Sequence, residues 1–392
     1  MTETAAPPRP LLDPSVPRGG IGVEGFYLAH FLAALFPATA GLLLYGWHAM
    51  VVIGGTLGCA AMAIAVWQRI GPRGRSLRFV HGMWFAMLLS LMLPASLAAE
   101  GAEGHASFWP LIPLGALLLV MLLWLFGGLG GRYSHPVLVT YLMLVICFPS
   151  AMVANRILTR DHLLLGEFMR SSPSDRPPPN EPWIARKHND RDADYTDSAA
   201  GRLARYTSGR ELPPRRWLPL SGLLRDSMPP LEDFIVAGQP GAIGASSVVA
   251  VIIAGLFLMY RGMIDFRIPL VSILSAYIAM LILPIPSVIA ATPQWHWLAF
   301  RQPDIGWSVA ITFVNYEIMA SPLIFTAFFL ASAPMIRPMT GRGRVIFAVM
   351  VGLTSAAFGL YISVANGPYL ALLIVSLLTP LIDRNFGVRP LF

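Results

Sequence analysis

Long apolar stretches follow one another along most of the chain, and they constrain its fold more than any other feature. A helix needs about 20 mostly apolar residues to cross the hydrocarbon core of a bilayer. Charged residues make up only 12% of the 392 residues, against about 25% in soluble domains, and hydrophobic residues make up 55%. This composition excludes a water-soluble enzyme, a disordered chain and a secreted disulfide protein. We expect an all-α integral membrane protein with about ten transmembrane helices, at 26–45, 49–68, 80–99, 108–127, 136–155, 245–263, 268–286, 309–331, 344–362 and 367–383.

The arginines predict the orientation of these helices. The formal net charge is +7, and Lys187 is the single lysine among 28 basic residues. Basic residues gather in the connections 69–78, 261–267 and 337–344, whereas the short connections between these contain almost none. Cytoplasmic loops are enriched in Lys and Arg, so we expect both termini in the cytoplasm of a bacterial inner membrane. Arginines scattered in this way do not form a phosphate-binding stripe, so the expected surroundings are lipid and other membrane subunits, with no nucleic acid.

One polar segment interrupts the apolar series. Residues 156–233 contain 13 of the 28 basic and 12 of the 21 acidic residues, and they follow the fifth expected span. That position places them on the outer side, which is the periplasm in a bacterium. The expected regions are a flexible cytoplasmic N-terminus at 1–25, a five-helix half at 26–155, a periplasmic loop or insertion at 156–244 and a second five-helix half at 245–392.

A short sequence recurs in the two expected halves. Leu91-Met92-Leu93-Pro94 ends the third expected span, and Leu281-Ile282-Leu283-Pro284 ends the seventh. Internal repeats are common in membrane transporters. A tetrapeptide of apolar residues and proline also recurs by chance in an apolar chain, so this recurrence supports no further inference by itself.

Glu317 is the only carboxylate well inside an apolar stretch. Intramembrane carboxylates are costly in lipid, and they usually face a cavity or a partner and mark ion pathways. We interpret Glu317 as a candidate proton or cation relay, and the alternative is a position at the outer interface.

No catalytic residue or metal site is predicted. The eight histidines lie mostly near the ends of the expected helices, where interfacial positions are expected, and a haem held by two of them is the alternative.

Glycines precede the sixth expected span in the segment 238–247. A helix N-terminus preceded by glycines offers free N–H groups that bind phosphate. The segment therefore suits a phosphate-bearing cofactor on the outer side. Tight packing of helices through small residues is the alternative interpretation.

Several segments, in this order, resemble one family of membrane subunits. They are Phe36–Trp47, Leu88–Pro94, Phe126-Gly127-Gly128-Leu129-Gly130, Gly241–Ser246, Tyr260–Pro269, Gly341–Phe347 and Pro380–Asp383. The family is NqrB/RnfD, shared by the Na+-translocating NADH:quinone reductase and the Rnf ferredoxin:NAD+ oxidoreductase. The resemblance covers most of the chain. It implies ten helices, an outer loop after the fifth helix, and flavin-based electron transfer together with other membrane subunits.

The chain departs from the family at the flavin attachment motif. Family members carry FMN esterified to the threonine of Ser-Gly-Ala-Thr, whereas this chain reads Ser221-Gly222-Leu223-Leu224. Leu224 has no hydroxyl group and cannot form that ester. Ala333 also replaces the aspartate of the family's Ala-Thr-Asp-Pro. We expect FMN or riboflavin to be held without a covalent bond at best, or not at all, and the candidate flavin residues are Ser221, Gly222, Gly241, Gly244, Ser246 and Ser247.

Three hypotheses on function follow from these observations. The first is a divergent inner-membrane subunit of a multi-subunit electron-transfer complex, without covalent FMN. The second is a flavin-free structural subunit that binds or stabilises a larger membrane complex. The third is a permease for a small molecule or an ion.

Overall fold

The computed structural model describes residues 22–70, 78–98, 108–125, 134–149, 151–152, 203–204, 206–207, 220–224, 231, 235, 242–289, 292–301 and 305–386. Most of the expected N-terminal segment, most of the expected periplasmic loop and the candidate residue Gly241 therefore lie outside the described residues.

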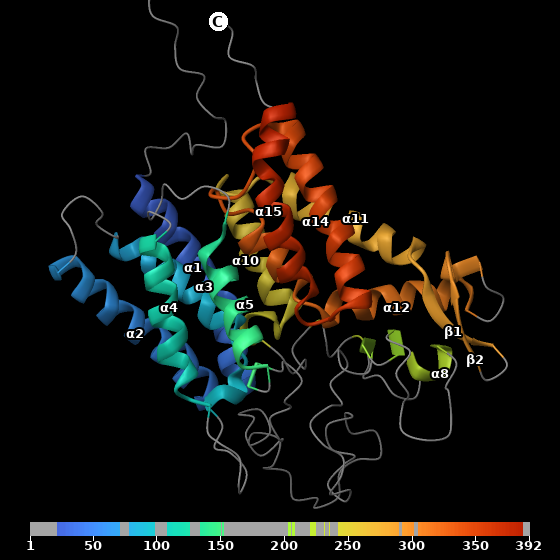
Figure 1. Cartoon of the computed structure of the whole chain (residues 1–392), viewed down its shortest axis with the longest axis horizontal. Coiled ribbons are helices and arrows are strands. Elements are labelled where there is room, and N and C mark those ends of the chain that lie inside the picture. Colours follow the sequence, from blue (N-terminus) through green and yellow to red (C-terminus); the bar gives the residue numbers. More distant parts are fainter. Residues whose placement is uncertain are drawn as a thin grey trace, which may run out of the picture.

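Helices make up almost all of the described structure (Figure 1). Ser247 and Thr340 cap the helices that follow them, because their hydroxyl oxygens accept hydrogen bonds from the N–H groups of Ala250 and Gly343. In the first region the helices are α1 (Val23–Tyr45), α2 (Trp47–Ile70), α3 (Phe79–Met92), α4 (Leu111–Leu125) and α5 (Pro136–Cys147). In the second they are α10 (Val248–Tyr260), α11 (Arg267–Ile282), α12 (Gly306–Ala320), α13 (Leu323–Phe325), α14 (Gly341–Tyr361) and α15 (Gly367–Phe386). Shorter elements are α8 (Leu220–Gly222), the 3-10 helices η1 (Ala95–Ala98), η5 (Ile243–Ala245) and η6 (Ala299–Arg301), and the π-helix η7 (Thr326–Leu330).

Four helices in the described residues are long and apolar enough to cross a membrane, namely α1, α2, α14 and α15. A fifth span results if α12 is joined to α13 and η7, although this pair is bent by 63°. Five further apolar helices, α3, α4, α5, α10 and α11, are shorter. The expectation of a helical membrane protein is confirmed, whereas the ten spans and the two five-helix halves stay predictions.

The buried core of the first region lies around α3. Eleven of the 14 residues of this helix are buried, including Trp84, Phe85 and Leu88, so it faces protein on nearly every side. It packs against α1, α2, α4 and α5. In contrast, α2 is largely exposed, with outward-facing residues such as Met50 and Met62. An apolar side chain exposed on a spanning helix is suited to contact lipid.

The helices α11 and α14 run parallel along their length. At one end, a Cβ atom placed on Gly341 would lie 2.5 Å from the guanidinium Nη1 of Arg267. At the other end, the hydroxyl group of Tyr361 donates a hydrogen bond of 2.9 Å to the carbonyl oxygen of Pro284. The chain must therefore cross back between them through α12, α13 and η7. This places the connections 262–266 and 331–340 at one end of the molecule and the connection 283–305 at the other.

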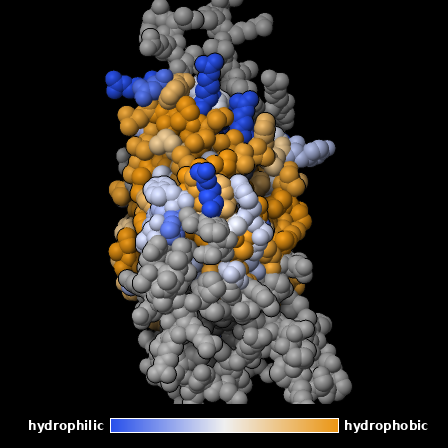
Figure 2. Space-filling model, turned by 90° about the vertical axis from the view of Figure 1, so that its right-hand side faces the viewer, coloured by the Kyte–Doolittle hydropathy of each residue, from blue (hydrophilic) through white to orange (hydrophobic). Residues whose placement is uncertain are grey.

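Arginines gather at the first of these ends. Figure 1 shows the start of α1 and the end of α15 at the same upper end, and Figure 2 shows hydrophilic side chains there above a broad hydrophobic band. Of the nine arginines in the described residues, only Arg301 lies at the opposite end. We call the first end the arginine-rich end; its arginines are Arg69, Arg78, Arg261, Arg267, Arg337, Arg342, Arg344 and Arg384.

The two copies of the recurring tetrapeptide end their helices in the same way. Leu93 after α3 has φ −72° and ψ 144°, and Leu283 after α11 has φ −61° and ψ 145°. The N–H group of each donates to the carbonyl oxygen four residues earlier. In both copies the leucine precedes a proline, and a residue before proline is sterically excluded from the helical region. The recurring tetrapeptide therefore has the same local structure at both places.

Two details differ from the sequence expectations. The expected connection between the seventh and eighth spans contains a β-hairpin of strands β1 (Ile285–Ile289) and β2 (Thr292–His296), in which Ile285 pairs with His296. The expected continuous span at 309–331 is broken after Ala320. Ser321 precedes Pro322 and has ψ 155°, so the steric restriction on a residue before proline ends α12 there.

Candidate functional site

Three interruptions of regular helix meet at one place in the molecule. After α3, the carbonyl oxygen of Leu93 accepts a hydrogen bond of 3.2 Å from the N–H group of Ile243, and Pro94 pairs with Ala242 as an isolated β-bridge. The third interruption is the break between α12 and α13. We call the segments Leu91–Pro94, Ala242–Ser247 and Ser321–Phe325 the break junction. Discontinuous helices that meet inside a membrane protein form the ion and substrate sites of many transporters.

Glycine allows these segments to approach each other. A Cβ atom on Gly244 would lie 2.7 Å from Cβ of Leu91 and 3.1 Å from Cε2 of Phe325. A Cβ atom on Gly41 of α1 would lie 2.8 Å from the carbonyl oxygen of Ile243. The glycine-rich segment had two interpretations, a site for a phosphate-bearing cofactor and tight packing of helices. At Gly244 this geometry is the tight packing.

Glu317 lies in the last turn of α12, one turn before the break. Its side chain is fully buried, and neither carboxylate oxygen has a hydrogen-bond partner in the described structure. Its backbone carbonyl oxygen accepts from the N–H group of Ser321 at 3.2 Å. An ionised carboxylate without a partner is very costly in an apolar interior. The carboxyl group therefore requires either a proton or a bound cation.

Two hydroxyl groups close to the breaks in sequence are also buried without a hydrogen-bond partner in the described structure. They are Ser96 in η1, just after α3, and Thr326, the first residue of the π-helix η7. Buried polar groups are rarely left unpaired, and each one calls for an explanation. Together with the carboxyl group of Glu317, they are oxygen atoms of the kind that bind a small cation or a water molecule.

The candidate flavin residues occupy two different segments. Ser246 and Ser247 follow the break at η5, where the hydroxyl group of Ser246 donates to the carbonyl oxygen of Ile243 at 2.7 Å and Ser247 caps α10. Ser221 and Gly222 belong to the separate short helix α8, where Ser221 is exposed and Leu224 is buried. The structure therefore brings Gly244, Ser246 and Ser247 together, while Ser221 is on another element.

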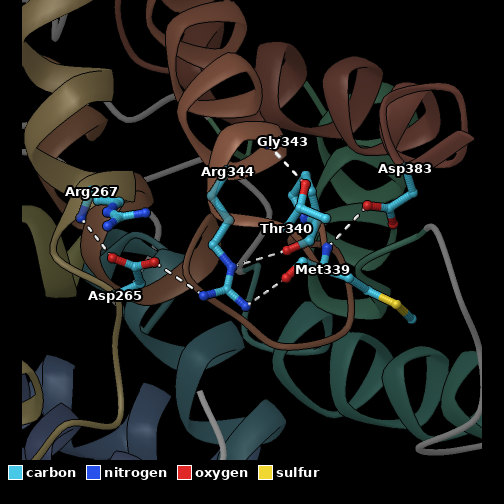
Figure 3. Close-up of polar contacts among 8 residues, drawn as sticks. Asp265, Arg267, Met339, Thr340, Gly343, Arg344 and Asp383 are labelled. Carbon is cyan, nitrogen blue, oxygen red and sulfur yellow. Dashed lines mark hydrogen bonds and ion pairs between the residues drawn. The ribbon is translucent and has the colours of Figure 1, made fainter. Parts of the chain in front are cut away.

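A buried ion pair joins several elements at the arginine-rich end (Figure 3). The guanidinium group of Arg344 on α14 lies 3.1 Å from the carboxylate of Asp265 before α11, and it also donates to the carbonyl oxygens of Pro338 and Met339. Asp265 in turn accepts from the N–H group of Arg267 at 3.1 Å. These contacts fix the connection that leads from η7 into α14.

The C-terminal end of α15 extends the same network. The carboxylate of Asp383 accepts from the N–H group of Met339 at 3.0 Å, and Thr340 donates to the carbonyl oxygen of Phe386. Sequence reasoning missed this network. The only signal was Asp265, the single acidic residue in the otherwise basic connection 261–267.

Three histidines are buried in an aromatic cluster. His81 lies 4.4 Å from Tyr27 and 4.6 Å from Phe85 between ring centroids, and His135 lies 5.5 Å from Phe85. His30 lies 5.6 Å from Trp84. Aromatic side chains of the protein therefore surround these three histidines, and their interfacial depth in the membrane stays a prediction. The described residues contain no group of three or more metal-binding side chains that could hold a metal ion.

Comparison with known proteins shows similarity over nearly the whole chain. The model of the NQR2, RnfD, RnfE family matches residues 17–390. The D subunit of the ion-translocating oxidoreductase complex of Halorhodospira halophila is 27% identical over 366 residues, which cover 92% of this chain and 88% of that protein. The protein of the same name in Pectobacterium atrosepticum is 25% identical over 356 residues, covering 90% of each chain.

A third relative is similar over a shorter length. The D subunit of the Na(+)-translocating ferredoxin:NAD(+) oxidoreductase complex of Acetobacterium woodii is 29% identical over 160 residues. The match covers 40% of this chain and 42% of that protein. This chain therefore spans less than half the length of that relative.

Proposed function

Because the chain belongs to the NQR2, RnfD, RnfE family, we propose that it is the RnfD-like membrane subunit of a multi-subunit, ion-translocating electron-transfer complex. The observation that carries the proposal is the family match from residue 17 to residue 390, supported by relatives named as the D subunit of such complexes. Its partners are the other membrane subunits of that complex.

We propose ten spans in two five-helix halves, with the regions divided at about 25, 155 and 244. The supporting observation is that the described residues contain four long apolar helices, five shorter ones and one bent pair, and that at least α3 and α12 end at breaks. A helix that ends inside protein at a break does not need the full length of a bilayer. The arginine-rich end then faces the cytoplasm of a bacterial inner membrane, and the segment 156–244 faces the periplasm.

We propose that Glu317 and the break junction form the ion-handling site of this subunit. The carboxyl group is buried, lacks a hydrogen-bond partner in the described structure and lies at the broken helix. A carboxylate in this setting binds a proton or a cation in exchange, which is the property that an ion relay requires.

We propose that any flavin is held without a covalent bond. Leu224 occupies the position of the family's esterified threonine, and its buried side chain has no hydroxyl group. The test is to purify the protein together with its membrane partners and to record flavin absorbance and in-gel fluorescence after denaturation. Flavin that is released on denaturation supports the proposal. Fluorescence that stays with this chain would contradict it. The attachment site would then be Ser221 or Ser227, which lies three residues after Leu224 and outside the described residues.

A second candidate function is a flavin-free structural subunit, which the loss of the threonine hydroxyl at Leu224 favours. A folded complex that contains no flavin but depends on this chain for its assembly would support the structural role.

A permease is the third candidate, favoured by the three breaks that meet at Gly244. Protein that purifies alone and is stabilised by a transported solute would select the permease over both other functions.

A further inference from the structure

Three exposed tryptophans gather around the hairpin between α11 and α12. The exposed fractions are 49% for Trp295, 63% for Trp297 and 59% for Trp307. Arg301 lies between them in sequence and is also exposed. Its charge is the only basic one among the described residues at this end of the molecule. Clustered exposed tryptophans are typical of a surface that binds another protein or a membrane.

The hairpin is held firmly to the ends of the neighbouring helices. The N–H group of Leu298 donates to the carbonyl oxygen of Ile282 at 3.2 Å, and Tyr361 donates to the carbonyl oxygen of Pro284 at 2.9 Å. Leu298 has φ 54°, a left-handed conformation that is unfavourable for leucine and persists only where the surroundings impose it. The tryptophans next to it therefore stay at a fixed height relative to α11 and α14.

A stacked pair of rings joins the hairpin region to α12. The rings of Phe300 and Trp307 lie 3.9 Å apart between centroids, with an angle of 18° between their planes. Trp307 is the second residue of α12. The position of this stack consequently sets the position of the N-terminal end of α12, the helix that carries Glu317.

The tryptophans lie where a lipid-facing surface ends. Exposed apolar side chains run along α11 from Leu274 through Ile278 to Ile282, just before the hairpin. On α12, Ile311 is exposed one turn after Trp307. Figure 2, which faces the hairpin side, shows a hydrophobic band with a paler, less hydrophobic surface below it. Tryptophan prefers such a boundary, because its ring is apolar while its N–H group forms hydrogen bonds.

We propose that the hairpin region is an anchor in the phospholipid headgroup layer at the end of the molecule opposite the arginine-rich end. Trp295, Trp297 and Trp307 contact the boundary between acyl chains and headgroups, and Arg301 binds a lipid phosphate. We favour lipid over a protein partner because the aromatic surface continues the apolar faces of α11 and α12 at their ends. The positive charge of Arg301 also complements a phosphate group. The anchor fixes the depth of α12 and depends on the membrane assignment alone, not on electron transfer.

The test measures the depth of one hairpin position in liposomes. In the full-length chain, Cys59 and Cys147 are replaced by alanine and a nitroxide is attached to Trp297→Cys. Matched labels go on Met62→Cys, which faces outward from α2, and on Glu24→Cys at the arginine-rich end. Collision rates with oxygen and with a water-soluble nickel chelate then give the depth of each label. We expect fewer chelate collisions at position 297 than at position 24, and fewer oxygen collisions than at position 62.

Two outcomes would overturn the anchor. Chelate collisions at position 297 as frequent as at position 24 would place the hairpin in water. Protection of position 297 that arises only after the other membrane subunits are added would make the surface a protein interface instead. If Trp297→Cys does not fold, as judged by size-exclusion chromatography, Trp295→Cys on β2 gives the same measurement and leaves the stacked pair intact.

Discussion

Glu317 combines complete burial with the lack of any hydrogen-bond partner in the described structure. Replacement by glutamine keeps the shape of the side chain and removes its ability to carry a charge. For Glu317→Gln we expect ion transport by the assembled complex to fall at least about tenfold, or roughly 1.4 kcal/mol, without loss of thermal stability in detergent. The measurement is ion uptake by proteoliposomes that contain the complex.

The matched control for this variant lies on the same helix. The hydroxyl group of Thr312 bonds only to the backbone of its own helix, at Ser308. Thr312→Ala should leave ion uptake unchanged, and Glu317→Asp, which keeps a carboxyl group, should restore part of it. Transport by Glu317→Gln at the wild-type rate would remove Glu317 from the ion pathway.

Gly244 can be tested against a second glycine in a matched pair. A Cβ atom on Gly244 would press against Leu91 and Phe325, whereas nothing lies within 4 Å of one on Gly58 of α2. Gly244→Ala should destabilise the protein by about 1–3 kcal/mol, the usual cost of overpacking. Gly58→Ala should be neutral or slightly stabilising, because alanine favours helix over glycine. Thermal unfolding in detergent measures both, and equal melting temperatures would argue against the close junction.

The ion pair of Asp265 and Arg344 has a control at the same end of the molecule. Their side chains are 15% and 6% exposed, whereas those of Glu24 and Arg78, 3.9 Å apart, are 67% and 54% exposed. Removing one partner of a buried pair costs about 3–5 kcal/mol, and an exposed pair contributes about 0–1 kcal/mol. Asp265→Asn should therefore lower the melting temperature far more than Glu24→Gln. Similar losses in the two variants would show that burial does not distinguish the pairs.

At the scale of elements, the bend between α12 and α13 depends on a single proline. Pro322 restricts Ser321 to an extended conformation, and Pro322→Ala removes that restriction. We expect the bend to become variable. Double electron–electron resonance between labels on Thr312→Cys and Met339→Cys should then show a broader distance distribution than in the protein with Pro322. An unchanged distribution would mean that tertiary contacts alone hold the bend.

The elements also show how far sequence reasoning reaches. Apolar length located α1, α2, α14 and α15 because a lipid-spanning helix needs a minimum number of apolar residues. The same criterion did not show the break at Ser321, since apolar residues continue on both sides of it. The residue pair Ser321-Pro322 was the available signal, and it required reading the steric effect of proline instead of hydropathy.

At the scale of the whole molecule, the sequence predicted family membership better than it predicted the site. The order of short motifs identified the family, and the spacing of arginines anticipated their concentration at one end. The burial of Glu317, His81 and His135 could not be predicted, because it depends on helices that are far apart in sequence. The pairing of Asp265 with Arg344 across 79 residues was hidden for the same reason.

The contact between Leu93 and Ile243 has a consequence for how the gene can be divided. Helix α1 packs on α10, and the segment after α3 bonds to the segment before α10, so the regions on either side of 156–233 contact each other directly. Two polypeptides, one ending and the other beginning within 156–200, before the buried Leu203, should therefore find each other in the membrane and restore a working protein. The same reasoning allows a reporter domain to be inserted there without separating the two regions.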